Sequence, residues 1–380
     1  MQKKPVRKDA RALAAGRRKF LKTAGLAGAA AAATIAMPQI SRAQTIVWKY
    51  QSTWPTKDIF HDDAVDYAKK VNDMTGGRLK LDVLAAGAVV PAFQLQDAVQ
   101  SGILDAGHGV CAYWYGKHKA YSLFGTPPSF GWDAHGFLAW FYYGGGETLY
   151  KELVTDILKL NLVGLLYFPM PTQPLGWFKK EIKSGDDFKG MKYRTVGLSA
   201  DLFKELGAAV TILPGGEIVP AMDRGLLDAA EFNNPSSDIL LGFPDVSKFY
   251  MMGSHHQQME AFEIIFNKQK YDALPAEIKA ILRNAAFSAS SDQLWYSYDR
   301  YSKDLEEIKK RGVNVFKTGP KVLADQLAAW DRVIAAQSQE PFFAKVIASQ
   351  KAWVKRTSAY LNVNNTDSIE LEKAYKHFFG

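Results

Sequence analysis

Most of the positive charge of this chain lies in its N-terminal segment. The 380 residues have a formal net charge of +8, while residues 1–43 hold ten Lys or Arg and one Asp, a net charge of +9. Residues 44–380 therefore carry about −1, so charge gives no reason to expect nucleic acid or an anionic membrane as partner. The single cysteine, Cys111, excludes an intramolecular disulfide, and we expect it to be buried.

The N-terminal segment has the three parts of an export signal in the required order. Arg17-Arg18-Lys19-Phe20-Leu21-Lys22 matches the R-R-x-F-L-K pattern of twin-arginine signals, and the apolar run from Thr23 to Ala36 follows it. Ser41-Arg42-Ala43 then supplies a small-x-small cleavage site. Residues 1–43 are predicted to be a signal peptide for twin-arginine export to the periplasm. An uncleaved anchor or a basic tail is the alternative.

Strand and helix patterns alternate from the start of the remaining chain. Thr45–Tyr50 and Leu79–Leu84 read as strands, and a helix is predicted from about Asp58 to Met74, ending at Gly76-Gly77. This alternation favours the α/β class.

An internal repeat indicates two similar α/β units. Gln96–Gly109 and Val219–Phe232 share the pattern A-apolar-x-x-G-x-L-D-A, at a constant offset of 123 residues. Each copy reads as a helix closed by a glycine, a short connection and a strand that begins at Asp-Ala. We therefore predict a two-lobed protein with a central cleft, in which residues 44–166 form lobe I and residues 167–260 form lobe II.

Ligands of open α/β sheets bind outside the carboxyl ends of the strands. The residues at those positions are Cys111–Tyr115 after the first repeated strand and Glu231–Asn234 after the second. The first set offers an aromatic wall, and the second offers a carboxylate, an aromatic ring and two amides. Two facing lobes around such a cleft are typical of a receptor that closes by a hinge.

The C-terminal part, residues 261–380, is predicted to contain the return segments of the hinge and long helices. An amphipathic pattern runs from Pro275 to Gly312, and the strand-like Val313–Phe316 follows it. Helices then continue from Pro320 to Leu361. Aromatic residues at helical spacing in this region are expected in the core or at a subunit contact: Trp330, Phe342, Phe343 and Trp353.

Two side chains are candidates for direct contact with a ligand. Arg194 lies in the short strand-like segment Met191–Val196, and a guanidinium matches a carboxylate with two parallel hydrogen bonds. Gln173 lies between two prolines in a rigid, extended segment, where its amide could orient a polar ligand or a cation. For both residues, an ordinary surface position is the alternative.

Several motifs of catalysis and cofactor binding are missing. Gly144-Gly145-Gly146 lacks the spacing of a phosphate-binding loop, and adjacent His255-His256 are poorly placed to chelate one metal. The paired carboxylates Asp62-Asp63 and Asp186-Asp187 are expected on the solvated surface. No nucleophile–base pair is recognisable, so an enzyme is not expected.

From about Ile46 to Pro275 the chain resembles the extracytoplasmic solute receptors of TRAP transporters, the DctP-type family. The segments that carry the resemblance include YQSTWP, AVQSGILDAGHG, QPLGWFKKEIKSGDDFKGMKYRTVG, LPGGEIVPAMDRGLLDAAEF and EIIFNKQKYDALP. The most similar subgroup binds 2-oxo or 2-hydroxy monocarboxylates. The resemblance implies a periplasmic receptor that delivers a small organic acid to a membrane permease and itself catalyses nothing.

The resemblance also assigns roles to individual residues. An arginine on the KGxKxR segment, here Arg194, holds the substrate carboxylate. The metal cation, Na⁺ or Ca²⁺, is implied at Gln173, Glu231, Phe232 and Gln257. The substrate is implied to contact Arg194 and also Gln173, Trp54, Tyr113, Tyr115, Phe232 and Asn233.

The chain departs from the subgroup next to this predicted site. Phe232 replaces a tryptophan, and Asn233–Asp238 replace the G-P-Y-D-D sequence of the relatives. These changes leave the identity of the cation and of the acid open. The alternative ligand is a dicarboxylate or an aromatic acid. A periplasmic sensor or an enzyme acting on organic acids also remains open. A helix-swapped homodimer is known in the subgroup, and the aromatic C-terminal helices permit one here.

Overall fold

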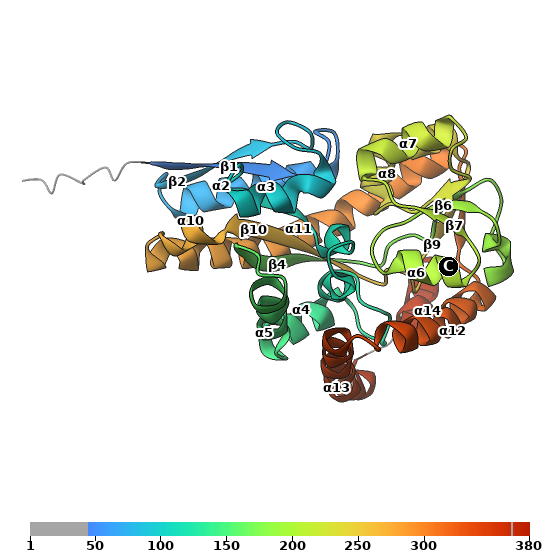
Figure 1. The fold of residues 1–380 in the computed structure, drawn as a ribbon. Coiled ribbons are helices and arrows are strands. Elements are labelled where there is room, and N and C mark those ends of the chain that lie inside the picture. The colour runs from blue at the N-terminus through green and yellow to red at the C-terminus, as the bar shows by residue number, and fades with distance from the viewer. Residues whose placement is uncertain (1–44, 366–367) are drawn as a thin grey trace, which may run out of the picture. The chain divides into compact units, whose positions relative to one another are not determined.

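The computed structural model describes residues 45–365 and 368–380, and the predicted signal peptide lies outside these ranges. Two β-sheets organise the described chain (Figure 1). Of the helices in these ranges, none is both long enough and apolar enough to cross a bilayer. The mixed α/β class predicted from the sequence is confirmed.

The first sheet has the strand order β2-β1-β3-β10-β4. Strand β1 pairs in parallel with β2 and β3, whereas β10 runs antiparallel to both β3 and β4. The alternating burial of β2 explains its Leu-Lys-Leu-Asp pattern, since Leu79 and Leu81 face the core. The strands are β1 Ile46–Ser52, β2 Leu79–Leu84, β3 Ala106–Val110, β4 Leu162–Met170 and β10 Glu260–Asn267.

The second sheet has the strand order β11-β9-β5-β8-β6-β7. Its strands β7, β6 and β8 are parallel neighbours, so their carboxyl ends lie at one edge. The strands are β5 Gly176–Phe178, β6 Lys192–Arg194, β7 Ala209–Thr211, β8 Ala229–Ala230, β9 Phe249–Met252 and β11 Asn314–Lys317.

The chain passes between the two sheets at three places. It leaves the first sheet after Met170 and returns to it at Glu260, and helix α11 (Ala276–Lys310) precedes strand β11 of the second sheet. Helix α11 packs against β4 and α2 and also against α8 (Figure 1). The two connecting segments between the sheets touch, because the Gln173 N–H donates to the Gln257 carbonyl at 3.1 Å. The lobe limits at residues 166 and 260 stay predictions.

Both copies of the predicted repeat fold in the same way. Helix α3 (Leu95–Ser101) ends at Gly102, whose φ is 81°, and β3 follows. Helix α7 (Gly215–Asp223) is followed by Gly225 with a φ of 71°, and then by β8. Glycine is favoured at both positions because this left-handed conformation is strained for other residues.

The remaining helices cover the sheets and form the C-terminal part. Helix α2 spans Ile59–Met74 and is capped by the Asp58 carboxylate. The others are α4 Ala134–Tyr143, α5 Gly146–Lys151, α6 Ser199–Glu205, α8 Pro235–Leu241, α9 Phe243–Val246, α10 Lys268–Asp272, α12 Pro320–Gln337, α13 Pro341–Asn364 and α14 Ser368–Phe379. Shorter turns are the 3₁₀ segments Ala92–Gln94, Cys111–Trp114, Lys119–Phe124 and Gly185–Phe188, and the π segment Glu152–Ile157.

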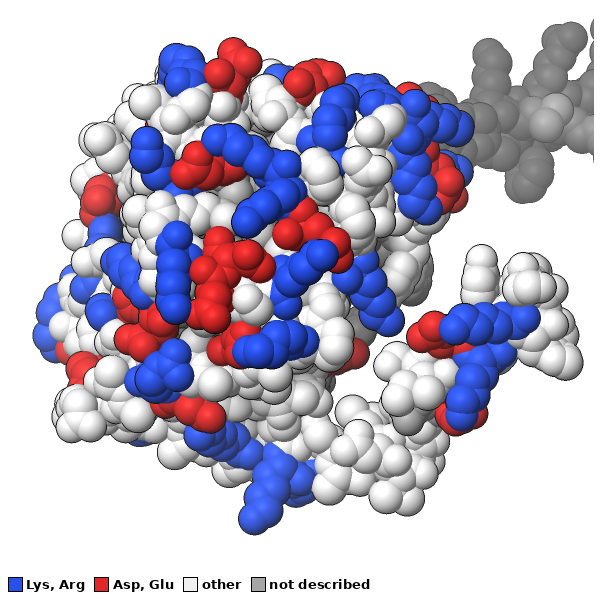
Figure 2. Space-filling view, turned by 90° about the vertical axis from the view of Figure 1, so that its right-hand side faces the viewer, with Lys and Arg blue, Asp and Glu red and all other residues white. Residues whose placement is uncertain are grey.

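The burial of individual residues confirms most expectations and corrects one. Cys111 is buried, as are Trp330 and Phe343 of the aromatic C-terminal helices. The prediction that Asp63 lies on the solvated surface is wrong: its side chain is buried on the inner face of α2, and burial raises its pKa well above the ordinary value. The face drawn in Figure 2 carries acidic and basic side chains intermingled, as expected for a nearly neutral chain.

Candidate functional site

Arg194 is the centre of a buried polar cluster at the carboxyl ends of β7, β6 and β8. It is the last residue of β6, and its side chain is only 1% exposed. Its Nε and Nη2 atoms donate to the Leu213 carbonyl at 2.9 and 2.7 Å, just after β7. Its Nη1 donates to Glu231, the residue after β8, at the carbonyl (3.1 Å) and at Oε1 (2.9 Å). The three strand ends are thus joined through one guanidinium.

Phe232 lies against this ion pair. The Arg194 guanidinium carbon is 5.7 Å from the centroid of the Phe232 ring, within the range of a cation–π contact. Gly215 lies against the Phe232 ring, because an added Cβ at Gly215 would be 2.4 Å from that ring. The aromatic ring therefore fixes the position of the guanidinium from one side.

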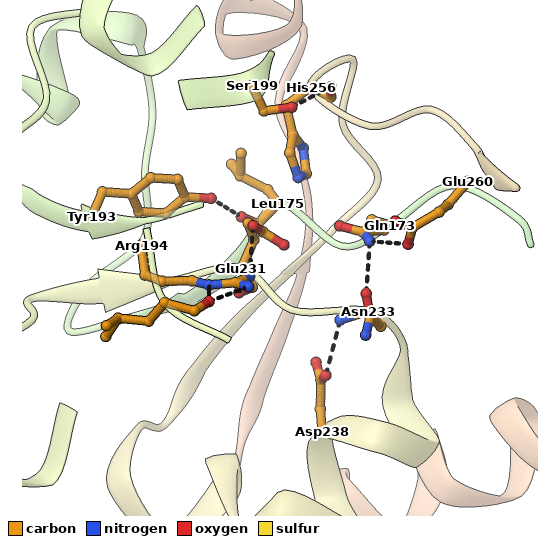
Figure 3. Close-up of polar contacts among 11 residues, drawn as sticks. Gln173, Leu175, Tyr193, Arg194, Ser199, Glu231, Asn233, Asp238, His256 and Glu260 are labelled. Atoms are coloured by element: carbon orange, nitrogen blue, oxygen red, sulfur yellow. Dashed lines mark hydrogen bonds and ion pairs between the residues drawn. The ribbon is translucent and has the colours of Figure 1, made fainter. Parts of the chain in front are cut away.

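Gln173, Asn233 and Glu260 form the second part of the cluster. The Gln173 Nε2 donates to the Asn233 Oδ1 at 2.8 Å and to the Glu260 Oε2 at 2.9 Å. In Figure 3 this group lies on one side and the Arg194–Glu231 pair on the other. The side chains of these three residues and of Arg194 and Glu231 are each at most 5% exposed, so the cluster is closed to solvent.

Several buried polar atoms of the cluster, and of the adjoining residues His256 and Gln257, have no hydrogen-bond partner among the described residues. Three are oxygens of predicted metal ligands: Gln173 Oε1, Glu231 Oε2 and Gln257 Oε1. The Asn233 Nδ2 and both ring nitrogens of His256 are also without a partner. Buried polar groups are rarely left unpaired, so these oxygens and nitrogens indicate a site built for something polar.

The electrostatics of the cluster are those of a dry, crowded site. Burial raises the pKa of Glu231 to about 7, although the Arg194 charge opposes this shift. Burial, together with the Glu231 charge, raises the pKa of Glu260 to about 8. Burial and the Arg194 charge lower the pKa of His256 to about 3, so its imidazole is neutral at pH 7. Two carboxylates close to one guanidinium leave an excess of negative charge when both ionise.

The predicted aromatic wall is only partly assembled next to this cluster. Trp54 follows β1, and its Nε1 donates to the His108 Nδ1 at 2.9 Å. The Tyr113 ring centroid lies 5.6 Å from that of Trp54. Burial raises the pKa of the Tyr113 phenol, and the charges of Arg194 and Glu231 also act on this pKa. Tyr113 and Trp54 therefore lie together beside the cluster.

Tyr115 makes its contacts elsewhere. Its hydroxyl donates to Asp201 Oδ2 at 2.7 Å, and the Lys119 ammonium lies 5.8 Å from its ring centroid. These contacts tie the 111–115 segment to helix α6. The assignment of Tyr115 to the ligand stays a prediction.

The segment that departs from the predicted pattern, Asn233–Asp238, starts helix α8. Asn234 caps that helix by accepting from the Ser237 N–H, and the Ser237 hydroxyl donates to Asp58. Asp238 accepts from the Trp177 Nε1 at 2.8 Å and from the Asn233 N–H at 3.3 Å. The segment therefore holds Asn233 in place from behind.

Sequence reasoning missed Glu260, which shares Gln173 with Asn233. It stands at the first position of an apolar strand, where a carboxylate more often marks a surface end. The signal that could have found it is its place three residues after the predicted metal ligand Gln257, at the start of β10.

The donors of the cluster suit a hard cation. Among the described residues, no group of three or more His, Cys, Asp or Glu is arranged to hold a metal ion. The unpartnered oxygens here come instead from two amides and one carboxylate. Carboxylate and amide oxygens are ligands that Ca²⁺ prefers, so the residues present fit Na⁺ or Ca²⁺ better than a transition metal.

Comparison with known proteins identifies the chain. Residues 50–340 match the bacterial extracellular solute-binding protein family 7, called DctP. The chain belongs to this family. The DctP proteins that it resembles are solute receptors of TRAP transporters and not enzymes.

Individual DctP relatives are similar over nearly the whole chain. A monocarboxylate 2-oxoacid-binding periplasmic protein from Nostoc is 32% identical over 95% of this chain and 98% of its own. A TRAP solute-binding protein from Bordetella bronchiseptica, a mixed-occupancy dimer with calcium and picolinate, has a TM-score of 0.81 and 26% identity, covering 88% and 97%. One from Pseudoalteromonas atlantica, with sodium and pyruvate, has a TM-score of 0.78 and 29% identity, covering 89% and 100%.

The raised pKa values predict that stability falls as the pH rises. For Glu231 and Glu260 the pKa rises from 4.5 to about 7 and about 8, so the folded protein holds both protons more tightly. This stabilisation is fully present below pH 4.5 and is lost as the pH rises to about 8. Buried neutral histidines such as His256 act oppositely only below pH 6.5. We therefore expect the free energy of unfolding of the ligand-free protein to fall between pH 6.5 and about 8.

Urea denaturation at a series of pH values, after treatment with a chelator, measures this slope. Each group contributes a slope of at most about 1.4 kcal/mol per pH unit. Glu260→Gln removes one group and should give a shallower slope than the unchanged protein. An identical slope in the variant would show that Glu260 does not titrate in this window.

Proposed function

We propose that this DctP receptor binds a small 2-oxo or 2-hydroxy monocarboxylate together with a cation at the Arg194 cluster. The observation that supports this most directly is the set of three buried oxygens without a partner, on Gln173, Glu231 and Gln257. A buried guanidinium next to three free oxygen ligands complements a carboxylate paired with a positive ion.

The carboxylate is proposed to bind Arg194. The four hydrogen bonds of this side chain use four of its five N–H donors and leave one on Nη2. The ligand can take this donor directly. It gains a second donor, on Nη1, if the Glu231 carboxylate turns from Arg194 toward the cation.

The cation is proposed to bind the oxygens of Gln173, Glu231 and Gln257, next to Phe232. When bound, it supplies a positive charge that holds the carboxylate and the 2-oxo or 2-hydroxy oxygen together. Asn233 Nδ2 is a free donor for the remaining polar atom of the ligand. Trp54 and Tyr113 cover the apolar part and exclude water.

The relatives support this ligand class and leave two cations open. The Nostoc protein is named for 2-oxoacids, and the Pseudoalteromonas structure contains sodium and pyruvate. The Bordetella structure contains calcium and picolinate, an aromatic acid. Pyruvate and picolinate both carry a second donor atom next to the carboxylate, so both can form a five-membered chelate. An aromatic 2-carboxylate is therefore the second candidate ligand.

The receptor is proposed to work in the periplasm and to pass its ligand to TRAP permease subunits. The twin-arginine pattern at Arg17-Arg18 supports export through the twin-arginine pathway, which carries folded proteins. Folding before export would allow the cation to be acquired in the cytoplasm. The cluster is closed to solvent, so ligand entry and release require the segments around it to open.

Arg194→Ala should abolish tight ligand binding. Removing one partner of a buried charge pair typically costs 2–5 kcal/mol, so we expect pyruvate affinity to fall about 30-fold or more. Isothermal calorimetry against 2-oxo, 2-hydroxy, dicarboxylic and aromatic acids measures the loss. Arg194→Lys keeps the charge but not the planar guanidinium. Its pyruvate affinity should therefore lie between those of the Arg194→Ala variant and the unchanged protein.

The matched control for this experiment is Arg224→Ala, because Arg224 is exposed and lies at the end of α7. The pyruvate affinity of the Arg224→Ala variant should equal that of the unchanged protein. Undiminished binding by a folded Arg194→Ala protein would refute Arg194 as the anchor.

A homodimer is proposed through helix α14. Its apolar residues recur at spacings of three and four and so share one face. They are between 59% and 76% exposed: Leu371, Tyr375, Phe378 and Phe379. An exposed apolar face of this kind is typical of a contact with another chain, and the Bordetella relative forms a dimer. A second copy of this chain is the proposed occupant.

Sedimentation at micromolar concentration tests this proposal. We expect a dimer for the unchanged protein and a monomer when Tyr375 and Phe379 are both changed to Ser, because the apolar contact is lost. The control, Lys373→Ser on the same helix, should stay dimeric. A monomeric unchanged protein would contradict the proposal.

A further inference from the structure

Glu260 is a second carboxylate in the cluster to which neither the sequence nor the family resemblance assigns a role. It begins β10, where it pairs with Met170 at the end of β4, and its side chain is 2% exposed. Its Oε2 accepts from the Gln173 Nε2 at 2.9 Å. The Glu231 and Arg194 charges both act on it, so it belongs to the same site.

Glu260 fixes the orientation of the Gln173 amide. An ionised carboxylate only accepts hydrogen bonds, so it requires the NH₂ end of the amide. The Asn233 Oδ1 takes the other Nε2 hydrogen at 2.8 Å. With both hydrogens used, the Gln173 Oε1 faces the remaining space of the site and is the atom without a partner.

Glu260 also sets the charge of the site. When both carboxyl groups are ionised, as they are above about pH 8, Glu231 and Glu260 contribute −1 each, Arg194 contributes +1, and His256 is neutral. A bound monocarboxylate adds a further −1 and brings the sum to −2. Uncompensated charge is costly in a buried site, so a divalent cation balances this set, whereas a monovalent cation leaves one negative charge.

We propose that Glu260 is a specificity-determining residue that makes this site prefer a divalent cation such as Ca²⁺ over Na⁺. The inference rests on the proposed function, because it assumes that ligand and cation bind together at Arg194. Without Glu260 the site and ligand would sum to −1, which Na⁺ balances. Glu260 therefore acts through charge and through the orientation of Gln173.

Other carboxylates near the site do not change this comparison. Asp238 lies behind Asn233 and is held by Trp177 and the Asn233 N–H. Asp58 is held by the Ser237 hydroxyl and the Phe60 N–H. Both add negative potential equally in the unchanged protein and in a Glu260 variant, so they cancel when the two are compared.

The test compares Glu260→Gln with the unchanged protein by calorimetry, with pyruvate as the probe. Chelator-treated protein is titrated at about pH 8.5, once in calcium without sodium and once in sodium without calcium. Glutamine keeps the size and an acceptor oxygen for the Gln173 amide but lacks the charge. We expect the ratio of pyruvate affinity in calcium to that in sodium to fall about tenfold or more in the variant.

Two further variants separate charge from general damage. Glu260→Asp keeps the charge and should keep the calcium preference. Glu263→Gln removes another buried carboxylate of β10, which accepts from the Trp114 Nε1 outside the cluster, and should leave the ratio unchanged. Thermal unfolding of each variant establishes that it is folded.

The proposal is overturned if Glu260→Gln binds pyruvate with the same calcium-to-sodium ratio as the unchanged protein. It is also overturned if Glu263→Gln lowers the ratio as much. Failure of the proposed function looks different: the unchanged protein would bind neither pyruvate nor the other acids of the panel with either cation.

Discussion

The buried guanidinium of Arg194 is the constraint around which the second sheet is arranged. A charge that is 1% exposed must be paired and hydrogen-bonded. Its partners come from the residues after β7 and β8, so the parallel order of β7, β6 and β8 is what makes its burial possible. The same strand ends then hold Glu231 and Phe232 at the site. The Arg194 side chain thus links the second sheet to the binding site.

The cluster retains polar atoms that the fold itself does not use. Gln173, Glu231 and Gln257 each keep a buried oxygen without a partner, and such atoms destabilise the folded state. The raised pKa values of Glu231 and Glu260 show that ionising these buried carboxyl groups also costs free energy. A bound cation would pair with the free oxygens and with the carboxylate charges, and a bound carboxylate would pair with Arg194. Together they would reduce both costs. Binding would therefore offset a cost that the folded protein carries at this cluster.

Local patterns in the sequence predicted more of the framework than of the site. The turns at Gly102 and Gly225 and the strands that follow them were predictable, because glycine and alternation act over a few residues. Asp63 was assigned wrongly to the surface, since the packing of α2 against α11 is not visible locally. Glu260 was missed for the same reason, because its partner Gln173 lies 87 residues away and only the crossing of the two sheets brings them together.

Ligand and cation are proposed to bind as one unit at Arg194. Such coupling is reciprocal: the factor by which the bound cation raises the affinity for the acid equals the factor by which the bound acid raises the affinity for the cation. Calorimetry of the chelator-treated protein with pyruvate, at increasing calcium and in the absence of sodium, gives the coupling directly. We expect pyruvate affinity to rise with calcium until the cation site is full. Pyruvate binding of equal strength with and without any metal cation would contradict it.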